Sequence, residues 1–209
     1  LIMGLCEGQN LKQERAGEPF SIADVIEVGL QLCDALIFAH ERHVFHGDIK
    51  PANVVAEYRR NKAVYRICDF GIARLSEDYS SSIYFTPGFG APEQQRGEAP
   101  TALSDQYSLG MTLSHLLDPS ASVSAKEVKL RNRLLDITER ATSSQPSRRF
   151  SSVSELKEKL SMLADDQSKA LQDASNSTVQ GQDSASSGLL PSLLCLEGVS
   201  LAGLGIALG

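Results

Sequence analysis

Residues 46–53 read His-Gly-Asp-Ile-Lys-Pro-Ala-Asn, and this stretch decides how the rest of the chain is interpreted. It places the carboxylate of Asp48 five residues before the amide of Asn53, with the cationic Lys50 between them. We place the whole stretch on one loop, because turn-forming residues such as Gly47 and Pro51 interrupt regular structure. The loop therefore offers a carboxylate, a cation and an amide oxygen close together in sequence.

A second carboxylate, Asp69, follows Asp48 by 21 residues. Two β-rich runs lie between them, at 53–56 and 63–68, and the polar stretch 57–62 separates these runs. This pattern predicts a β-hairpin. Because a hairpin returns its end to its start, we expect both carboxylates and the amide of the loop to converge on one site.

Phosphoryl transfer needs a carboxylate near the attacking hydroxyl and oxygen ligands for the Mg²⁺ that accompanies the triphosphate. Asp48, Asn53 and Asp69 could together supply such oxygens at one site. Lys50 would neutralise charge on the moving phosphoryl group. The spacing thus favours phosphoryl transfer.

The loop at 46–53 resembles the catalytic loop of protein kinases, and Asp69-Phe70-Gly71 matches that family's metal-binding triplet. Three more stretches resemble family motifs and follow in the family's order: the end of an activation segment at 86–94, the start of a central buried helix at 104–110, and a late arginine motif at 146–150. Lys50 and Thr86 are typical of the Ser/Thr-specific branch. The Ala-Pro-Glu-Gln ending resembles bacterial-type, eukaryotic-like Ser/Thr kinases.

The resemblance implies a role for each residue of the loop. Asp48 would orient the hydroxyl of a protein Ser/Thr acceptor and accept its proton, Lys50 would contact the γ-phosphate of ATP, and Thr86 would brace both. Asn53 and Asp69 would hold Mg²⁺, or Mn²⁺ in its place. The implied partners are thus ATP and a protein substrate.

The resemblance also assigns the adenine site. Residues 1–6 look like the last strand of a small lobe running into the hinge, with Met3 as gatekeeper. The backbone of Gly4 and Cys6 would meet the adenine edge, and Val55 would form the floor beneath it.

Structural roles carry over in the same way. Residues expected to support the site share polar or aromatic side chains at family positions: a buried Glu93–Arg149 ion pair, Asp105 holding the catalytic-loop backbone, and His46 stacked with Phe70.

Two features depart from the family pattern. Gly47 stands where most kinases carry an arginine that pairs with an activation-loop phosphate, so we do not expect that switch here. The Gly-rich loop, the strand lysine and the small lobe are not recognisable, which predicts a fragment with negligible activity by itself. The alternative is a catalytically dead, kinase-like interaction module.

Apolar residues recur at helical spacing over 22–42, 104–117, 128–141 and 152–163. Ser21 and Asp24 form a predicted capping box at the first of these helices. The fold class is therefore mainly α, the large lobe of a protein kinase, with a small β-hairpin at the catalytic loop and a disordered C-terminal tail.

Composition divides the chain into three regions. Residues 1–164 are expected to form the kinase domain, 165–187 a disordered polar linker, and 188–209 an apolar segment. The last segment has 22 residues and one charge, Glu197, so its length allows a truncated transmembrane helix. Glu197 opposes insertion by about 2.5–3.5 kcal/mol, and an apolar tail without a membrane role is the alternative.

The whole chain has 209 residues, 42% of them apolar, and a net charge of −6. Such a surface is a poor ligand for nucleic acid, because phosphate contacts need a basic patch. The four cysteines form no CxxC pair, which favours a reducing cytoplasmic location, with membrane anchoring through 188–209 if that segment spans a bilayer.

Overall fold

The computed structural model describes residues 8–14, 20–60, 62–70, 85–117 and 124–180. The chain divides into two units, Leu1–Ala170 and Leu171–Gly209. The first unit contains every residue discussed below as part of the site. The predictions for 1–7 and 188–209 lie outside the described residues.

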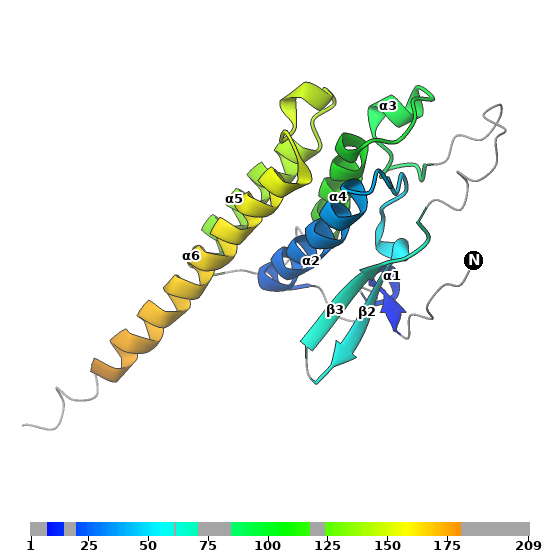
Figure 1. Ribbon diagram of the computed structural model, residues 1–209. Coiled ribbons are helices and arrows are strands. Elements are labelled where there is room, and N and C mark those ends of the chain that lie inside the picture. Colours follow the sequence, from blue (N-terminus) through cyan, green and yellow to red (C-terminus); the bar gives the residue numbers. More distant parts are fainter. Residues whose placement is uncertain (1–7, 15–19, 61, 71–84, 118–123, 181–209) are drawn as a thin grey trace, which may run out of the picture. The chain divides into compact units, whose positions relative to one another are not determined.

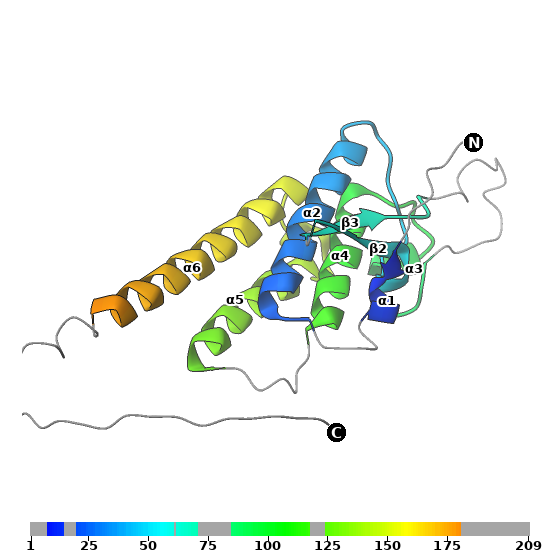
Figure 2. The same cartoon turned by 90° about the horizontal axis from the view of Figure 1, so that it is seen from below.

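The first unit is built mainly from helices, as the sequence predicts. These are α2 (Ile22–His40), α4 (Ala102–Leu116), α5 (Ala125–Ala141) and the first part of α6 (Val153–Gln180), joined by the short α3 (Pro92–Gln95). In both views the part of α6 that belongs to the first unit, residues 153–170, and the hairpin lie on opposite sides of α2 and α4 (Figures 1 and 2). The apolar faces of α2, α4, α5 and α6 meet in one core, whose fully buried large side chains include Leu32, Leu36, Leu109, Leu113, Leu134, Leu156 and Leu160.

The long helix α2 begins where the capping pattern predicts. The Ser21 hydroxyl accepts the backbone N–H of Asp24 at 3.1 Å, and the Ser21 N–H donates to the Asp24 carboxylate at 3.1 Å. This reciprocal pair satisfies donors that the first helical turn leaves without intrahelical acceptors. Farther along, a Cβ at Gly29 would lie 2.9 Å from Leu160 Cδ1, so glycine allows α6 to approach α2 closely.

The predicted hairpin is confirmed, and it belongs to a three-stranded antiparallel sheet. Strand β2 (Val54–Arg59) pairs with β3 (Lys62–Ile67), with Val54 opposite Ile67 and Arg59 opposite Lys62. The strands extend into the polar stretch that we assigned to the turn. There Glu57 pairs with Arg59 on its own strand and with Arg66 on β3. A short strand, β1 (Gln9–Asn10), adds to the edge of β2 and leads into α1 (Leu11–Glu14), which the sequence did not predict.

Helix α6 extends beyond its predicted end into the segment that we predicted to be a disordered linker. It continues to Gln180, so residues 165–180 of the predicted disordered linker are helical. No proline or glycine interrupts that stretch before Gly181, and Lys, Ala, Leu and Gln within it favour a helix. In the part of the chain that the structure describes, no helix combines the length and the hydropathy that crossing a bilayer requires.

Candidate active site

The loop at 46–53 connects the end of α2 to β2, and a buried carboxylate holds its backbone. Asp105, in the first turn of α4, is fully buried and accepts the N–H of His46 at 2.8 Å and that of Gly47 at 2.7 Å. His40 adds a third contact, with its Nε2 2.9 Å from the same carboxylate. The predicted support of the loop by Asp105 is therefore present.

Asp48 lies at the centre of a dense hydrogen-bond cluster. Its Oδ1 accepts the Thr86 hydroxyl at 2.7 Å and the Thr86 N–H at 3.0 Å. Its Oδ2 lies 2.6 Å from Lys50 Nζ, which also donates to the Thr86 hydroxyl at 2.5 Å. The structure thus brings together all three residues that the sequence predicts to be catalytic.

Asn53 is joined to the same cluster through its amide nitrogen. Nδ2 donates to the Asp48 backbone carbonyl at 2.8 Å and lies 3.3 Å from Asp48 Oδ2. Asn53 ends the short 3₁₀ helix η1 (Pro51–Asn53) and is buried, so the amide is held firmly in place. Because the nitrogen makes these contacts, the oxygen is the end of the amide that can serve as a cation ligand.

The hairpin brings Asp69 back to this loop. The Cys68 N–H donates to the Asn53 carbonyl at 2.8 Å, which places Asp69 one residue from a direct backbone contact with Asn53. Asp69 is exposed and has φ of +60°, a left-handed conformation that Asp tolerates better than most residues. Its backbone therefore turns sharply where the chain leaves the sheet.

His46 connects the loop to the residues around Asp69. Its Nδ1 accepts the Asp48 N–H at 3.1 Å, and its Nε2 lies 2.9 Å from the Cys68 carbonyl. This pattern fits the neutral tautomer with the proton on Nε2. The His46 and Phe70 rings pack edge to face at 4.8 Å, as we expected.

The predicted Glu93–Arg149 ion pair is present and buried. Both terminal nitrogens of Arg149 donate to the Glu93 carboxylate, at 2.6 Å and 2.8 Å. Burial of Glu93 raises its pKa, but the Arg149 hydrogen bonds outweigh this effect and the pKa of the Glu93 carboxyl is lowered. Arg149 also donates to the Ser143 and Leu103 carbonyls, so the pair connects α3 to α4 and to the turn after α5.

Comparison with known proteins decides the family. A family model described as the protein kinase domain matches residues 1–177. The chain belongs to the protein kinase domain family.

Curated relatives are bacterial kinases of the Ser/Thr type. The serine/threonine-protein kinase PknB of Mycolicibacterium smegmatis is 36% identical over 124 residues, which cover 56% of this chain and 19% of PknB. The serine/threonine-protein kinase Pkn1 of Myxococcus xanthus is 36% identical over 123 residues, which cover 56% of this chain and 18% of Pkn1. The chain thus spans less than a fifth of the length of these relatives.

Solved structures support the fold. The crystal structure of the Mycobacterium tuberculosis PknI kinase domain superposes with a TM-score of 0.58 and 27% identity, covering 77% of this chain and 64% of that one. The predicted resemblance to a bacterial-type Ser/Thr kinase and the mainly helical, kinase-like fold are both confirmed.

Two supporting residues of the kinase site were missed in the sequence. His40 contacts Asp105, and Gln94 donates its Nε2 to the Gly47 carbonyl at 2.7 Å. Gln94 was quoted only as the end of the activation-segment motif. Its position directly after Glu93, which we predicted to be buried, was the signal that could have placed it against the core.

The adenine side of the predicted site is described only in part. Met3, Gly4 and Cys6 lie outside the described residues, so their contacts with adenine stay a prediction. Val55 is half-buried on β2, opposite Arg66 on β3, and its role as the adenine floor also stays a prediction.

The oxygen donors of the loop fit the Mg²⁺ that accompanies ATP in this family. Among the residues that the structure describes, no group of three or more His, Cys, Asp or Glu side chains could hold a metal ion. The predicted donor set is of another kind, one amide oxygen of Asn53 and the carboxylate of Asp69. Such hard oxygen ligands suit Mg²⁺, which usually takes one or two carboxylates and completes its shell with water and phosphate.

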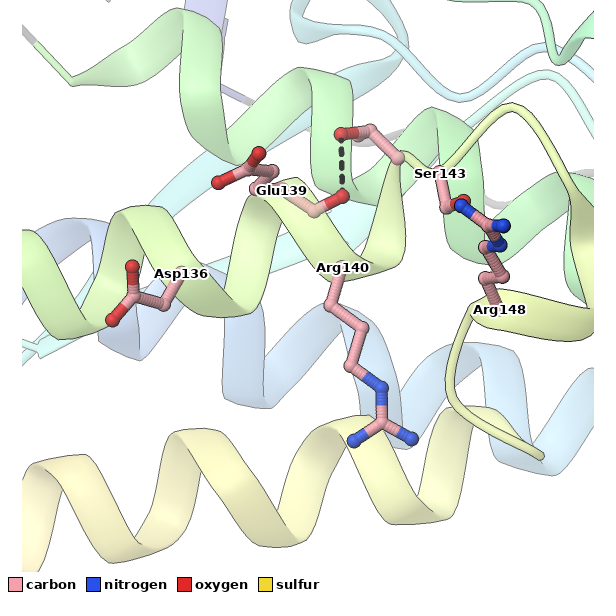
Figure 3. A pocket seen from close by; sticks show the side chains of 6 residues that line it. Asp136, Glu139, Arg140, Ser143 and Arg148 are labelled. Atoms are coloured by element: carbon pink, nitrogen blue, oxygen red, sulfur yellow. Dashed lines mark hydrogen bonds between the residues drawn. The ribbon is translucent and has the colours of Figure 1, made fainter.

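An open hollow lies elsewhere, at the C-terminal end of α5. Asp136, Glu139, Arg140, Thr142, Ser143 and Arg148 line it, from α5, the following turn and the 3₁₀ helix η3 (Pro146–Arg148) (Figure 3). Arg140 points from this hollow toward α6, where it pairs with Glu155 at 3.2 Å (Figure 3). The hollow contains none of the predicted site residues.

Proposed function

We propose that this chain carries the phosphoryl-transfer half of a Ser/Thr protein kinase, moving the γ-phosphate of ATP to a protein hydroxyl. The proposal is carried by the Asp48 cluster, in which one carboxylate is held by Thr86 on one oxygen and by Lys50 on the other. Such fixed geometry is what positioning a hydroxyl for transfer requires.

Asp48 is the residue that meets the acceptor hydroxyl in this proposal. A hydroxyl within hydrogen-bond distance of its carboxylate is oriented for attack on the γ-phosphorus of ATP. As the new O–P bond forms, the bond from the γ-phosphorus to the bridging oxygen breaks and ADP leaves, while the proton of the hydroxyl passes to the carboxylate. Thr86 keeps Asp48 in this orientation through two hydrogen bonds, one from its backbone and one from its hydroxyl. Because Thr86 precedes α3, the end of the activation segment shapes the position of Asp48.

Lys50, Asn53 and Asp69 complete the proposed site. Bound MgATP supplies the phosphoryl group and the metal charge that stabilises its oxygens. Asn53 and Asp69 would hold Mg²⁺ or Mn²⁺ through their oxygens. Lys50, whose Nζ lies 2.6 Å from Asp48, would place its positive charge beside the group that moves.

Phosphoryl transfer by the full-length protein carrying this chain tests the proposal. Radiolabelled γ-phosphate is followed from ATP to Ser- and Thr-containing acceptor peptides, with Mg²⁺ present or chelated. Asp48→Asn keeps the size of the side chain but removes the base, and it is expected to slow transfer by about 10²–10⁴-fold. Asp136→Asn, an exposed change on α5, is the matched control and is expected to leave the rate unchanged.

Each outcome separates the proposal from its alternative. Wild-type transfer that persists in Asp48→Asn would contradict the role of Asp48. Binding of nucleotide without transfer in the wild type would favour the kinase-like interaction module that the sequence also allowed.

A further inference from the structure

The two peptides that flank Gly47 are fixed by side chains from two separate elements. The Gly47 N–H donates to Asp105 Oδ1 at 2.7 Å, and the Gly47 carbonyl accepts Gln94 Nε2 at 2.7 Å. Asp105 is fully buried and Gln94 is 4% exposed, so water does not replace either partner easily. In a buried setting, hydrogen bonds of this kind are costly to lose.

The orientation of the Gln94 amide is itself determined by the backbone of α3. Its Oε1 accepts the Ala91 N–H at 3.1 Å, which leaves the nitrogen as the end that faces Gly47. The preceding residue, Glu93, is held by Arg149 through two short hydrogen bonds. The anchored end of the activation segment and the catalytic loop are therefore connected through adjacent residues.

Gly47 makes this connection a backbone contact. It has φ of +80°, and a Cβ at this position would lie 2.8 Å from Pro100 Cγ and 3.7 Å from Gln94 Nε2. A side chain at position 47 would thus meet Pro100 beside the bridging amide. The absence of a side chain lets the loop pack closely against Gln94 and Pro100.

We propose that Gln94 is a positioning residue, which transmits the anchoring of α3 to Asp48 by fixing the Gly47–Asp48 peptide. That this affects catalysis rests on the proposed function of Asp48. The link consists of the Gln94 amide, which belongs to α3, and the Gly47 carbonyl. The orientation of Asp48 therefore depends on the position of α3.

Two backbone amides report the orientation of Asp48 without any need for activity. The Asp48 N–H donates to His46 Nδ1, and the Thr86 N–H donates to Asp48 Oδ1. If Gln94 fixes the peptide, both amides lose protection from hydrogen exchange when the link is removed. Amides inside α4 should keep their wild-type rates, because their hydrogen bonds lie within the helix.

Hydrogen exchange followed by NMR on the full chain, without nucleotide, is the test. Gln94→Met keeps the length of the side chain but cannot donate, and it is expected to speed exchange at Asp48 and Thr86 about tenfold. Gln95→Met is the matched control, since Gln95 is exposed and its Nε2 donates to the Gly90 carbonyl at 2.9 Å. This control should leave both amides unchanged.

A second variant and a measurement on the wild type distinguish loss of the Gln94 hydrogen bond from misfolding of one variant. Gln94→Glu keeps the acceptor for the Ala91 N–H and, when ionised, replaces the donor with a charged carboxylate oxygen, so it should speed exchange at the same two amides. In the wild type, the side-chain NH₂ of Gln94 should exchange more slowly than that of Gln95. Equal exchange of these two side chains, or wild-type rates at Asp48 and Thr86 in a folded Gln94 variant, would overturn the proposal.

Hydrogen-exchange rates and phosphoryl-transfer rates together distinguish this inference from the proposed function. Loss of protection in the variants, together with a wild type that transfers no phosphate, would retain the link and reject the kinase activity. Unchanged protection together with an active wild type would reject the link and retain the activity.

Discussion

The carboxylate of Asp105 accepts the backbone N–H of Gly47 at 2.7 Å, across 58 positions of sequence. The same carboxylate accepts the His46 N–H and contacts His40 Nε2. One buried acid on α4 therefore connects the end of α2 to the loop that carries Asp48. This arrangement explains how a loop of small and polar residues keeps a defined shape beside a helical core.

Removing this acid should lower stability strongly. Asp105→Ala leaves two backbone donors buried without acceptors, at about 1–3 kcal/mol each. Asp105→Asn keeps one oxygen and should cost less. Urea unfolding followed by circular dichroism measures both variants, and a loss below about 1 kcal/mol for Asp105→Ala would show that the loop does not depend on this contact.

The Glu93–Arg149 pair predicts a second large effect. Arg149→Met leaves the Glu93 charge buried without its partner and is expected to destabilise the fold by about 3–5 kcal/mol. Glu93→Met combined with Arg149→Met removes both charges and should recover much of this loss. A double variant less stable than Arg149→Met alone would contradict the account.

The same pair gives stability a defined dependence on pH. The folded-state pKa of Glu93 is lowered, so its ionisation stabilises the fold above the unfolded pKa, which is about 4.3. This contribution disappears as pH falls through the lower, folded-state pKa. The difference in unfolding free energy between the wild type and Glu93→Gln should therefore be full at pH 7 and should shrink below about pH 4. A difference that stays constant into acid would mean that ionisation of Glu93 is not involved.

Alanine substitutions at Gly47 and Gly97 separate the cost of backbone strain from the cost of a steric contact. Both have positive φ, +80° and +85°, but only a Cβ at Gly47 meets a neighbour, Pro100 Cγ at 2.8 Å. Gly97→Ala should cost about 1–2 kcal/mol from the left-handed backbone alone. Gly47→Ala should cost more, and chemical unfolding of the two variants gives the difference. Equal losses would show that the contact with Pro100 yields at little cost.

Cys33 should be protected from alkylation in the folded protein. It is fully buried on α2, and burial is the main reason why the pKa of its thiol rises to about 12. The thiolate that reacts is therefore scarce at pH 8 and shielded as well. Iodoacetamide labelling with peptide mass spectrometry should modify Cys33 only after unfolding, and rapid labelling under native conditions would contradict its place in the core.

Much of the fold and of the site followed from the sequence because it depends on local patterns. The capping box at Ser21 indicated the start of α2, and two β-rich runs on either side of a polar stretch predicted the hairpin. Asp48, Lys50 and Thr86 were predicted together because they lie in two stretches that resemble motifs of one family, and the structure places them within one hydrogen-bond cluster.

Other features depend on contacts between distant segments, which spacing does not reveal. Gln94 reaches Gly47 across 47 positions, and His40 reaches Asp105 across 65. The edge strand β1 has only two residues, and it pairs because β2 offers a free edge. The extension of α6 was missed because a polar composition was taken for disorder, although the Lys, Ala, Leu and Gln residues within it favour a helix.

The central claim is that Asn53 and Asp69 face one nucleotide-bound cation beside Asp48. Paramagnetic Mn²⁺, added with ATP to the isotopically labelled full chain, tests it most directly by NMR. We expect the side-chain NH₂ of Asn53 and the backbone N–H of Asp69 to broaden first, while the side-chain NH₂ of Asn132 on α5 stays sharp. Broadening at another acidic surface, with Asn53 and Asp69 unaffected by the bound ion, would contradict it.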